Sequence, residues 1–245
     1  MRLIKTGFLV GVLALGGCGG NTAILEDIGK IAEQALGQSG SSLSIEDITG
    51  GLKQALSIGT GNVVSQLGQV NGFNADPVAH IPLPNALVKA RDVASRVGLA
   101  SSFDSLENRM NQAAEKAVPL AKDLFVSAIR QMTLDDARAI LQGSDDAATQ
   151  FFRRTTGDQL RNSMRPIIDN SLGQVGAVRA FEQLMTSYRR IPFAPPVEAN
   201  LTEHVLDKGM DGIWHYIAVE ESAIRQNPVK RTTELLRRVF GSQDS

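Results

Sequence analysis

The chain has 245 residues, of which 42% are hydrophobic and 21% charged, and its 25 basic side chains nearly balance its 26 acidic ones. This length suffices for a substantial core, and the lack of a basic excess argues against a nucleic-acid partner. The single cysteine excludes an intrachain disulfide framework and a cysteine-based metal cluster.

The N-terminus has the pattern of a bacterial export signal. Arg2 and Lys5 form a short basic region, and the apolar run 7–15 is too short to span a bilayer as a permanent helix. The run LGGC at 15–18 resembles the lipobox, in which the cysteine receives a diacylglyceryl group and the leader is cut just before it. We therefore expect lipidation of Cys18; an ordinary secretory leader with a chance cysteine is the alternative.

An acylated cysteine anchors a protein to a membrane without any spanning helix. Residues 1–17 would then be the lipoprotein signal peptide, and residues 18–43, with Gly and Ser at both ends, a flexible tether. Gly19 stands where some Gram-negative lipoproteins carry a retention aspartate. By analogy we expect a location in the cell envelope, facing the periplasm, at the outer membrane rather than the inner one.

The mature chain shows helical periodicity from Ser44 onward. Apolar residues recur at helical spacing up to Leu67, although four glycines weaken this run. Residues 70–84 contain Gly, Asn and three prolines, which predicts an irregular or extended loop.

The clearest helix spans 103–128. Its apolar residues recur at steps of three or four, which is the signature of one buried stripe. They are Phe103, Leu106, Met110, Ala113, Ala117, Ala121, Leu124 and Ala128. Pro119 lies within the run, so we predict a kink or break near Ala117.

Two caps are predicted next. Thr133 and Asp136 resemble a capping box that opens a helix ending at Gly143, and Ser144 is predicted to cap a helix over 145–155. We interpret the paired acids after each cap as first-turn carboxylates that stabilise the helix N-terminus, rather than as metal ligands.

Further helices are predicted in the C-terminal part. They cover 157–172, 175–188, 201–226 and 228–240, with a proline-rich link at 191–196. No stretch alternates with period two. We predict an all-α fold: one multi-helix, bundle-like domain over 44–241, followed by a disordered tail at 242–245.

Several segments together resemble a known family. They are GLKQALSIGTGNVVSQLG (51–68), IPLP (81–84), AAEKAVP (113–119), QGSDDAATQFFRRTT (142–156) and RTTELLRRVFG (231–241). In this order they resemble the uncharacterised bacterial family catalogued as domain of unknown function 4197, over roughly 44–241. The resemblance implies a single domain and brings no activity, cofactor or catalytic residue.

One helix carries a stripe of possible metal ligands. On an ideal helix its members fall near one face, where imidazole and carboxylate groups can chelate a divalent ion. They are His204, Asp207, Asp211 and His215. The alternative is the solvated face of an amphipathic helix, because the opposite face is apolar.

Two functional hypotheses follow. The first is a non-enzymatic envelope lipoprotein whose helical domain binds an apolar or lipid-like ligand, or another envelope protein, with no catalytic residue and no cofactor. It predicts a groove lined by Phe125, Phe151, Phe181 and Trp214. The alternative is a metal-binding protein or metal-dependent enzyme centred on the His/Asp stripe.

Arginine pairs recur at 153–154, 189–190 and 237–238. Such pairs suit anionic lipid headgroups, acidic glycans or the carboxylates of a partner. The alternative is helix C-terminal charge, which we assign to the first two pairs.

Overall fold

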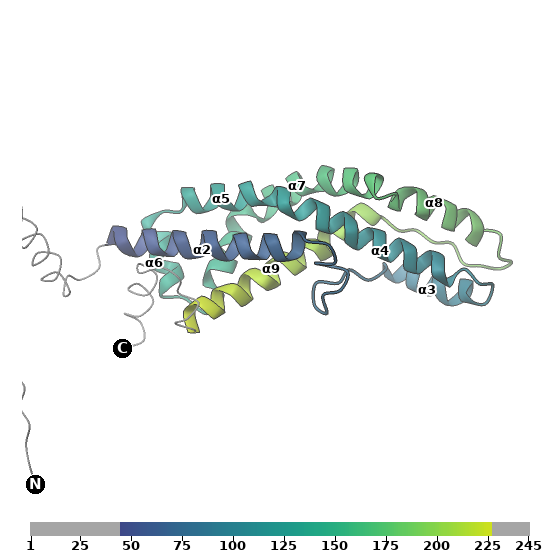
Figure 1. Cartoon of the computed structure of the whole chain (residues 1–245), viewed down its shortest axis with the longest axis horizontal. Coiled ribbons are helices and arrows are strands. Elements are labelled where there is room, and N and C mark those ends of the chain that lie inside the picture. The colour runs from purple at the N-terminus through teal and green to yellow at the C-terminus, as the bar shows by residue number, and fades with distance from the viewer. Residues whose placement is uncertain (1–44, 227–245) are drawn as a thin grey trace, which may run out of the picture. The chain divides into compact units, whose positions relative to one another are not determined.

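The computed structural model describes residues 45–226, in which helices are joined by turns and extended segments and no strand occurs (Figure 1). The all-α prediction is therefore confirmed for this part of the chain. The predicted signal peptide, Cys18, the tether, the cap at Ser44, the helix over 228–240 and the tail lie outside the described residues.

The helices follow one another with short connections, apart from two longer segments at 69–84 and 189–200. They are α2 (Ile45–Gly68), α3 (Asn85–Ser95), α4 (Ala100–Ala117), the 3₁₀ turn η1 (Val118–Ala121), α5 (Lys122–Gln131), α6 (Leu134–Leu141), α7 (Ala147–Gln174), α8 (Ala177–Tyr188) and α9 (Leu201–Gln226).

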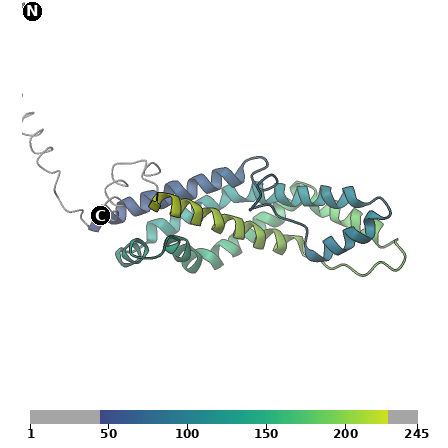
Figure 2. The same ribbon diagram turned by 90° about the horizontal axis from the view of Figure 1, so that it is seen from below.

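The packing centres on α7 and α9, which form the most extensive helix pair. The N-terminal helix α2 packs against α9 and α5, whereas α4 packs against α7 and α8. Both views show α9 beside α2 (Figures 1 and 2). No helix among the described residues is long and apolar enough to cross a membrane.

The predicted stripe over 103–128 forms part of the core. Phe103, Leu106 and Met110 are fully buried on α4. The helix ends at Ala117, and Pro119 lies in η1, after which α5 begins. The predicted break is confirmed; it arises because proline has no N–H to donate to the preceding turn.

Residues 147–174 form one continuous helix, so the prediction of two helices over 145–155 and 157–172 is wrong. Both Gly157 and Pro166 lie inside α7. The buried side chains of Phe152, Leu160 and Met164 continue one stripe across the glycine. Packing of this stripe outweighs the cost of about 1 kcal/mol that a helical glycine carries relative to alanine.

Helix α3 is not predicted by the sequence pattern. It begins directly after Pro84, and it buries Leu87, Ala90 and Ala94. Three buried apolar side chains in eleven residues give only a weak periodic signal in the sequence. The helix is stabilised by packing against α4 rather than by its own propensity.

One of the two capping predictions is confirmed and the other is wrong. At α6 the box is confirmed: the Asp136 amide donates to Thr133 Oγ1 at 3.1 Å, and the Thr133 amide donates to Asp136 Oδ2 at 3.0 Å. At α7 the prediction is wrong, because the helix begins only at Ala147 and Ser144 Oγ donates to Asp146 Oδ1 instead. The second acidic pair therefore precedes the helix.

The α7 N-terminus is capped from α9 instead. The backbone amides of Ala148 and Thr149 donate to the two carboxylate oxygens of Glu221 at 2.8 and 2.9 Å. The arginine pair 153–154 lies in the first half of α7, so its assignment to a helix end is also wrong, whereas Arg189 directly follows α8.

Candidate functional site

The structure does not gather the His/Asp stripe of α9 around one point. His204 Nε2 lies 2.7 Å from the Pro82 carbonyl oxygen, whereas Asp207 pairs with Arg161. Asp211 lies 3.4 Å from Lys208 Nζ, and the His215 ring packs edge-on against Tyr216. No group of three or more His, Cys, Asp or Glu residues within 45–226 is arranged to hold a metal ion. The stripe is thus the polar face of an amphipathic helix, with each member directed to a different partner.

The four aromatic residues predicted to line a groove do not line a common one. Phe125 and Trp214 are 1% and 5% exposed, and their rings meet edge-to-face at 5.8 Å. Phe152, which is not among the four, joins them 5.9 Å from Phe125. These three rings fill the core, so the prediction that Phe125 and Trp214 line a groove is wrong.

The other two residues reach the surface at separate places. Phe151 packs against Phe152 and lines two hollows of about 170 and 260 Å³ between α5, α6 and α7. Phe181 lines a different hollow of about 670 Å³ between α8 and residues 197–200. We call this larger space the α8 hollow.

The α8 hollow is open and mixed in character. Its nine lining residues are Phe181, Glu182, Met185, Thr186, Arg189, Val197, Glu198, Ala199 and Asn200. Apolar side chains come from both walls, and charged ones surround them. One wall is an extended segment, and none of the backbone hydrogen bonds among the described residues involves positions 197–199. Unused N–H and C=O groups on an extended segment can pair with a second extended chain.

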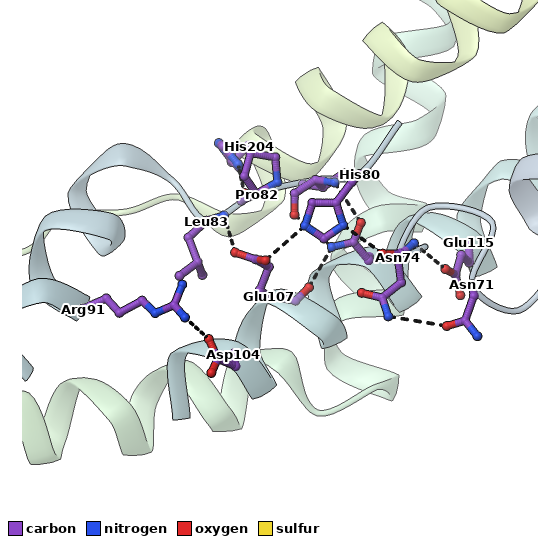
Figure 3. Close-up of polar contacts among 12 residues, drawn as sticks. Asn71, Asn74, His80, Pro82, Leu83, Arg91, Asp104, Glu107, Glu115 and His204 are labelled. Carbon is purple, nitrogen blue, oxygen red and sulfur yellow. Dashed lines mark hydrogen bonds and ion pairs between the residues drawn. The ribbon is translucent and has the colours of Figure 1, made fainter. Parts of the chain in front are cut away.

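A second polar feature is the loop 69–84, which α4 holds through a ladder of side chains four residues apart (Figure 3). Glu115 Oε1 accepts the amides of Phe73 and Asn74 at 3.2 and 3.1 Å. Further along the ladder, Glu107 Oε2 accepts the amide of Leu83 at 3.0 Å. We call this segment the clamped loop.

Asn111 forms the central rung of the ladder. Its Oδ1 accepts the Ile81 amide at 2.8 Å, and its Nδ2 donates to the Ile81 carbonyl at 2.9 Å. Both residues are fully buried. The side-chain amide therefore replaces the backbone partner that a strand would offer to an extended residue.

His80 ties the clamped loop to the ladder. Its Nε2 lies 3.0 Å from Glu107 Oε1, and its Nδ1 lies 3.1 Å from the Asn74 carbonyl (Figure 3). Both ring nitrogens thus face acceptors, and both ends of the ring are used to hold the chain. Such contacts are typical of a histidine that stabilises the fold rather than of a general base, because both ring nitrogens are already engaged by the chain itself.

Helix α9 holds the opposite side of the clamped loop. Asp76 Oδ1 accepts the amides of Val78 and Ala79, while its Oδ2 accepts the Tyr216 hydroxyl at 2.6 Å. A Cβ built at Gly212 would lie 3.2 Å from Ala79 Cβ and 3.3 Å from the Phe73 ring. A glycine at this position lets the loop approach the helix closely.

The Asp76–Tyr216 contact changes the ionisation of both groups. Burial opposes ionisation of Asp76, but hydrogen bonds from the Ala79 amide, the Tyr216 hydroxyl and the Val78 amide outweigh it and lower its pKa. Burial and the neighbouring carboxylate raise the pKa of Tyr216 to about 12. The hydrogen bond between them therefore stabilises the fold fully from above the ordinary Asp pKa of 3.8 up to the ordinary Tyr pKa of 10.0. It is lost as the pH falls through the lowered Asp value or rises through the raised Tyr value.

This contact gives a spectroscopic prediction. In a Tyr188→Phe background, Tyr216 is the remaining tyrosine, and its ultraviolet absorbance should titrate with a pKa of about 12. Adding Asp76→Asn should move the pKa down toward 10.0, because the amide carries no charge to oppose the phenolate. Asp158→Asn, an exposed change on α7, is the matched control; an Asp76→Asn titration equal to this control would contradict the assigned contact.

The residues of the clamped loop are not predicted as a site by the sequence, although one signal is present. Asn111 and Glu115 lie on the same buried side of α4 as Met110 and Ala114. A polar residue inside an apolar stripe needs a partner from elsewhere in the chain. That signal marks a buried contact, but it does not identify the loop that makes it.

The described residues form an all-α protein whose longest loop is held by buried polar side chains of α4. A family model described as "Protein of unknown function (DUF4197)" matches residues 42–241, and the chain belongs to this family. This confirms the resemblance inferred from the five segments. Neither the curated proteins nor the solved structures contain a significant match to the chain.

Proposed function

We propose that the protein is a non-enzymatic lipoprotein of the bacterial envelope, anchored through acylated Cys18 at the outer membrane and facing the periplasm. In this proposal its helical domain docks an extended segment of another envelope protein. The N-terminal lipobox pattern supports the anchor. Two of the three histidines, His80 and His204, are engaged in holding the clamped loop, which supports a role in binding rather than in catalysis.

The observation that carries the docking proposal is the α8 hollow. Its volume of about 670 Å³ matches the size of known binding sites, and its open form suits a chain that passes through it. Phe181 and Met185 offer apolar contact, and positions 197–199 offer unused backbone groups. Main-chain pairing would supply affinity, while the apolar and charged lining would select the side chains of the partner.

A protein partner is favoured over an apolar ligand held between the helices. The space where such a ligand would lie is filled by Phe125, Phe152 and Trp214, whose rings pack edge-to-face. Arg153 covers the Trp214 ring from outside at 5.8 Å. A well-packed aromatic cluster leaves no volume for a guest without rearrangement.

Site-specific photocrosslinking in intact cells tests the docking. A photoreactive residue at Thr186, in the wall of the hollow, should give one protein adduct, whereas Val178, exposed on the same helix outside the hollow, should not. Ala199→Arg should abolish the adduct at 186, because a long charged side chain fills the hollow from the extended wall.

Two further arms test the anchor and the alternative occupant. Cys18→Ala cannot be acylated, so this chain should leave the membrane fraction and lose the adduct. Equal adducts at 178 and 186, or an adduct that survives Ala199→Arg, would contradict docking in the hollow. An organic compound released when the purified protein is denatured in a mass spectrometer would favour the ligand alternative.

A further inference from the structure

The segment that joins α8 to α9 presents an aromatic side chain to solvent. Phe193 is 104% exposed relative to a reference residue, and its backbone is left-handed with φ at +61°. This conformation costs an L-residue roughly 1–2 kcal/mol. Because the ring is not buried, no packing within the described chain offsets that cost. Within residues 45–226 the fold gains nothing from an aromatic side chain at this position.

The chain around Phe193 holds the ring outward. The Ile191 amide donates to the Tyr188 carbonyl at 3.0 Å, and the Ala194 amide donates to the Ile191 carbonyl at 3.2 Å. Ile191 and Ala194 also pack against the core, one on each side of the exposed residue. Prolines at 192, 195 and 196 further restrict the backbone. The turn is therefore a defined structure that projects Phe193.

A second exposed apolar residue lies at the same end of the described helices. The turn between α3 and α4 lies beside the segment 189–197 in both views (Figures 1 and 2). Val97, which is 57% exposed, lies in this turn. We call residues 95–99 and 189–197 together the aromatic tip.

The aromatic tip carries only positive charge. Arg96, Arg189 and Arg190 are exposed, and the two segments that form the tip contain no acidic residue. None of the ion pairs found among residues 45–226 includes any of these three arginines. Glu182 and Glu198 border Arg189 in the α8 hollow, beyond the tip itself. Basic groups around a projecting aromatic ring complement a surface that is anionic outside and apolar beneath.

We propose that the aromatic tip binds an anionic lipid bilayer, with Phe193 inserted at the level of the headgroups and Arg96, Arg189 and Arg190 against lipid phosphates. Aromatic rings favour the membrane interface, and guanidinium groups pair with phosphate through two parallel hydrogen bonds. A free phosphate ion would use the arginines but not the ring. Arg189 and Val197 also line the α8 hollow, but Phe193, Arg96 and Arg190 do not, and the proposal does not depend on docking in the hollow.

Tryptophan fluorescence tests insertion directly. The chain has one tryptophan, Trp214, which is buried, so the spectrum of Phe193→Trp minus that of the parent isolates the introduced indole. The full chain is reconstituted into vesicles of phosphatidylcholine, or of phosphatidylcholine with phosphatidylglycerol. In one arm of the experiment, the vesicles that hold the protein contain brominated acyl chains. In the other arm these vesicles are unbrominated, and only separately added acceptor vesicles contain brominated acyl chains. We expect quenching and a blue shift of the introduced indole with anionic brominated lipid in at least one arm.

Charge variants measure the electrostatic part. A surface arginine contributes about a fivefold change in affinity for an anionic membrane, so Arg189→Gln with Arg190→Gln should raise the lipid concentration for half-maximal quenching roughly thirtyfold. Arg154→Gln, an exposed arginine of α7, should leave it unchanged, and Leu120→Trp, exposed in η1, should not be quenched. The proposal would be overturned if the indole introduced by Phe193→Trp stayed solvent-exposed with anionic lipid in both arms. The alternative binding partner of the aromatic tip would then be a protein with a pocket for the ring.

Discussion

Replacing Glu221 with alanine should lower the free energy of unfolding by about 3–5 kcal/mol, which is the cost of breaking a buried charged pair by removing one partner. The carboxylate is only 6% exposed and accepts hydrogen bonds from two helices. On α7 it accepts the Ala148 and Thr149 amides and the Thr149 hydroxyl. On its own helix it accepts Arg225 Nη2 at 2.9 Å.

The loss of stability is expected to be large because the site is buried, so water cannot replace the carboxylate as a hydrogen-bond acceptor. The alanine variant leaves two amides at the α7 N-terminus without their acceptor, at the positive end of the helix dipole. It also leaves the Arg225 guanidinium, which donates to the Ile140 carbonyl at 2.7 Å, without its buried counter-ion. The contact between α6, α7 and α9 thereby loses the carboxylate whose hydrogen bonds join α7 to α9 and hold Arg225 against α6.

Urea unfolding followed by circular dichroism at neutral pH measures the effect. Glu221→Gln keeps the shape and one acceptor oxygen, so its loss should be intermediate. Asp158→Ala removes an exposed carboxylate from α7 and should change stability by less than about 0.5 kcal/mol. A Glu221→Ala loss as small as that of the control would show that the cap and ion pair add nothing to the fold.

The elements that could be predicted from sequence are those whose cause is local. Thr133 and Asp136 are three residues apart and form the predicted capping box, and Pro119 ends α4 near the predicted position. Helix α9 begins at the predicted residue, 201, and continues to Gln226, the last residue that the structure describes, because its apolar stripe is long and regular. Periodicity and backbone chemistry act within a few residues, so they can be read from the chain alone.

The elements that could not be predicted depend on residues distant in the chain. Glu221 caps a helix that begins more than seventy residues earlier, and no local pattern marks it as a cap. The sequence pattern places His204 in a metal stripe, but in the folded chain it faces the Pro82 carbonyl, 122 residues away. A helical wheel gives the face on which a side chain lies, but not the segment that packs against that face.

The groove prediction failed for a related reason. Phe125 and Trp214 are candidates for a groove because they are large and apolar, and the same properties place them in the core. Phe181 reaches the surface beside 197–200, a segment without regular structure whose path depends on tertiary contacts. Hydrophobicity alone does not separate a side chain that fills the core from one that lines a site.

Replacing Asn111 with alanine should lower the free energy of unfolding by about 2–6 kcal/mol, because it leaves the buried N–H and C=O groups of Ile81 without partners. Each orphaned group carries a penalty of about 1–3 kcal/mol. Gln112→Ala, an exposed change on the next residue of α4, is the control and should be nearly neutral. Asn111→Leu restores the buried volume but not the hydrogen bonds, so a loss similar to that of alanine would assign the effect to polar pairing.

Hydrogen exchange of individual amides shows how far the Asn111 effect reaches. The Ile81 amide should lose protection first, followed by the Leu83 amide, which donates to Glu107 on the same ladder. The clamped loop also buries Phe73, Ile81 and Leu83 completely against α4 and α9, so releasing it exposes core side chains. We therefore expect protection in α9 to fall together with that of the loop. If only the loop amides exchanged faster while α9 kept its protection, the loop would be a separable surface element, because its side chains would then contribute little to the core.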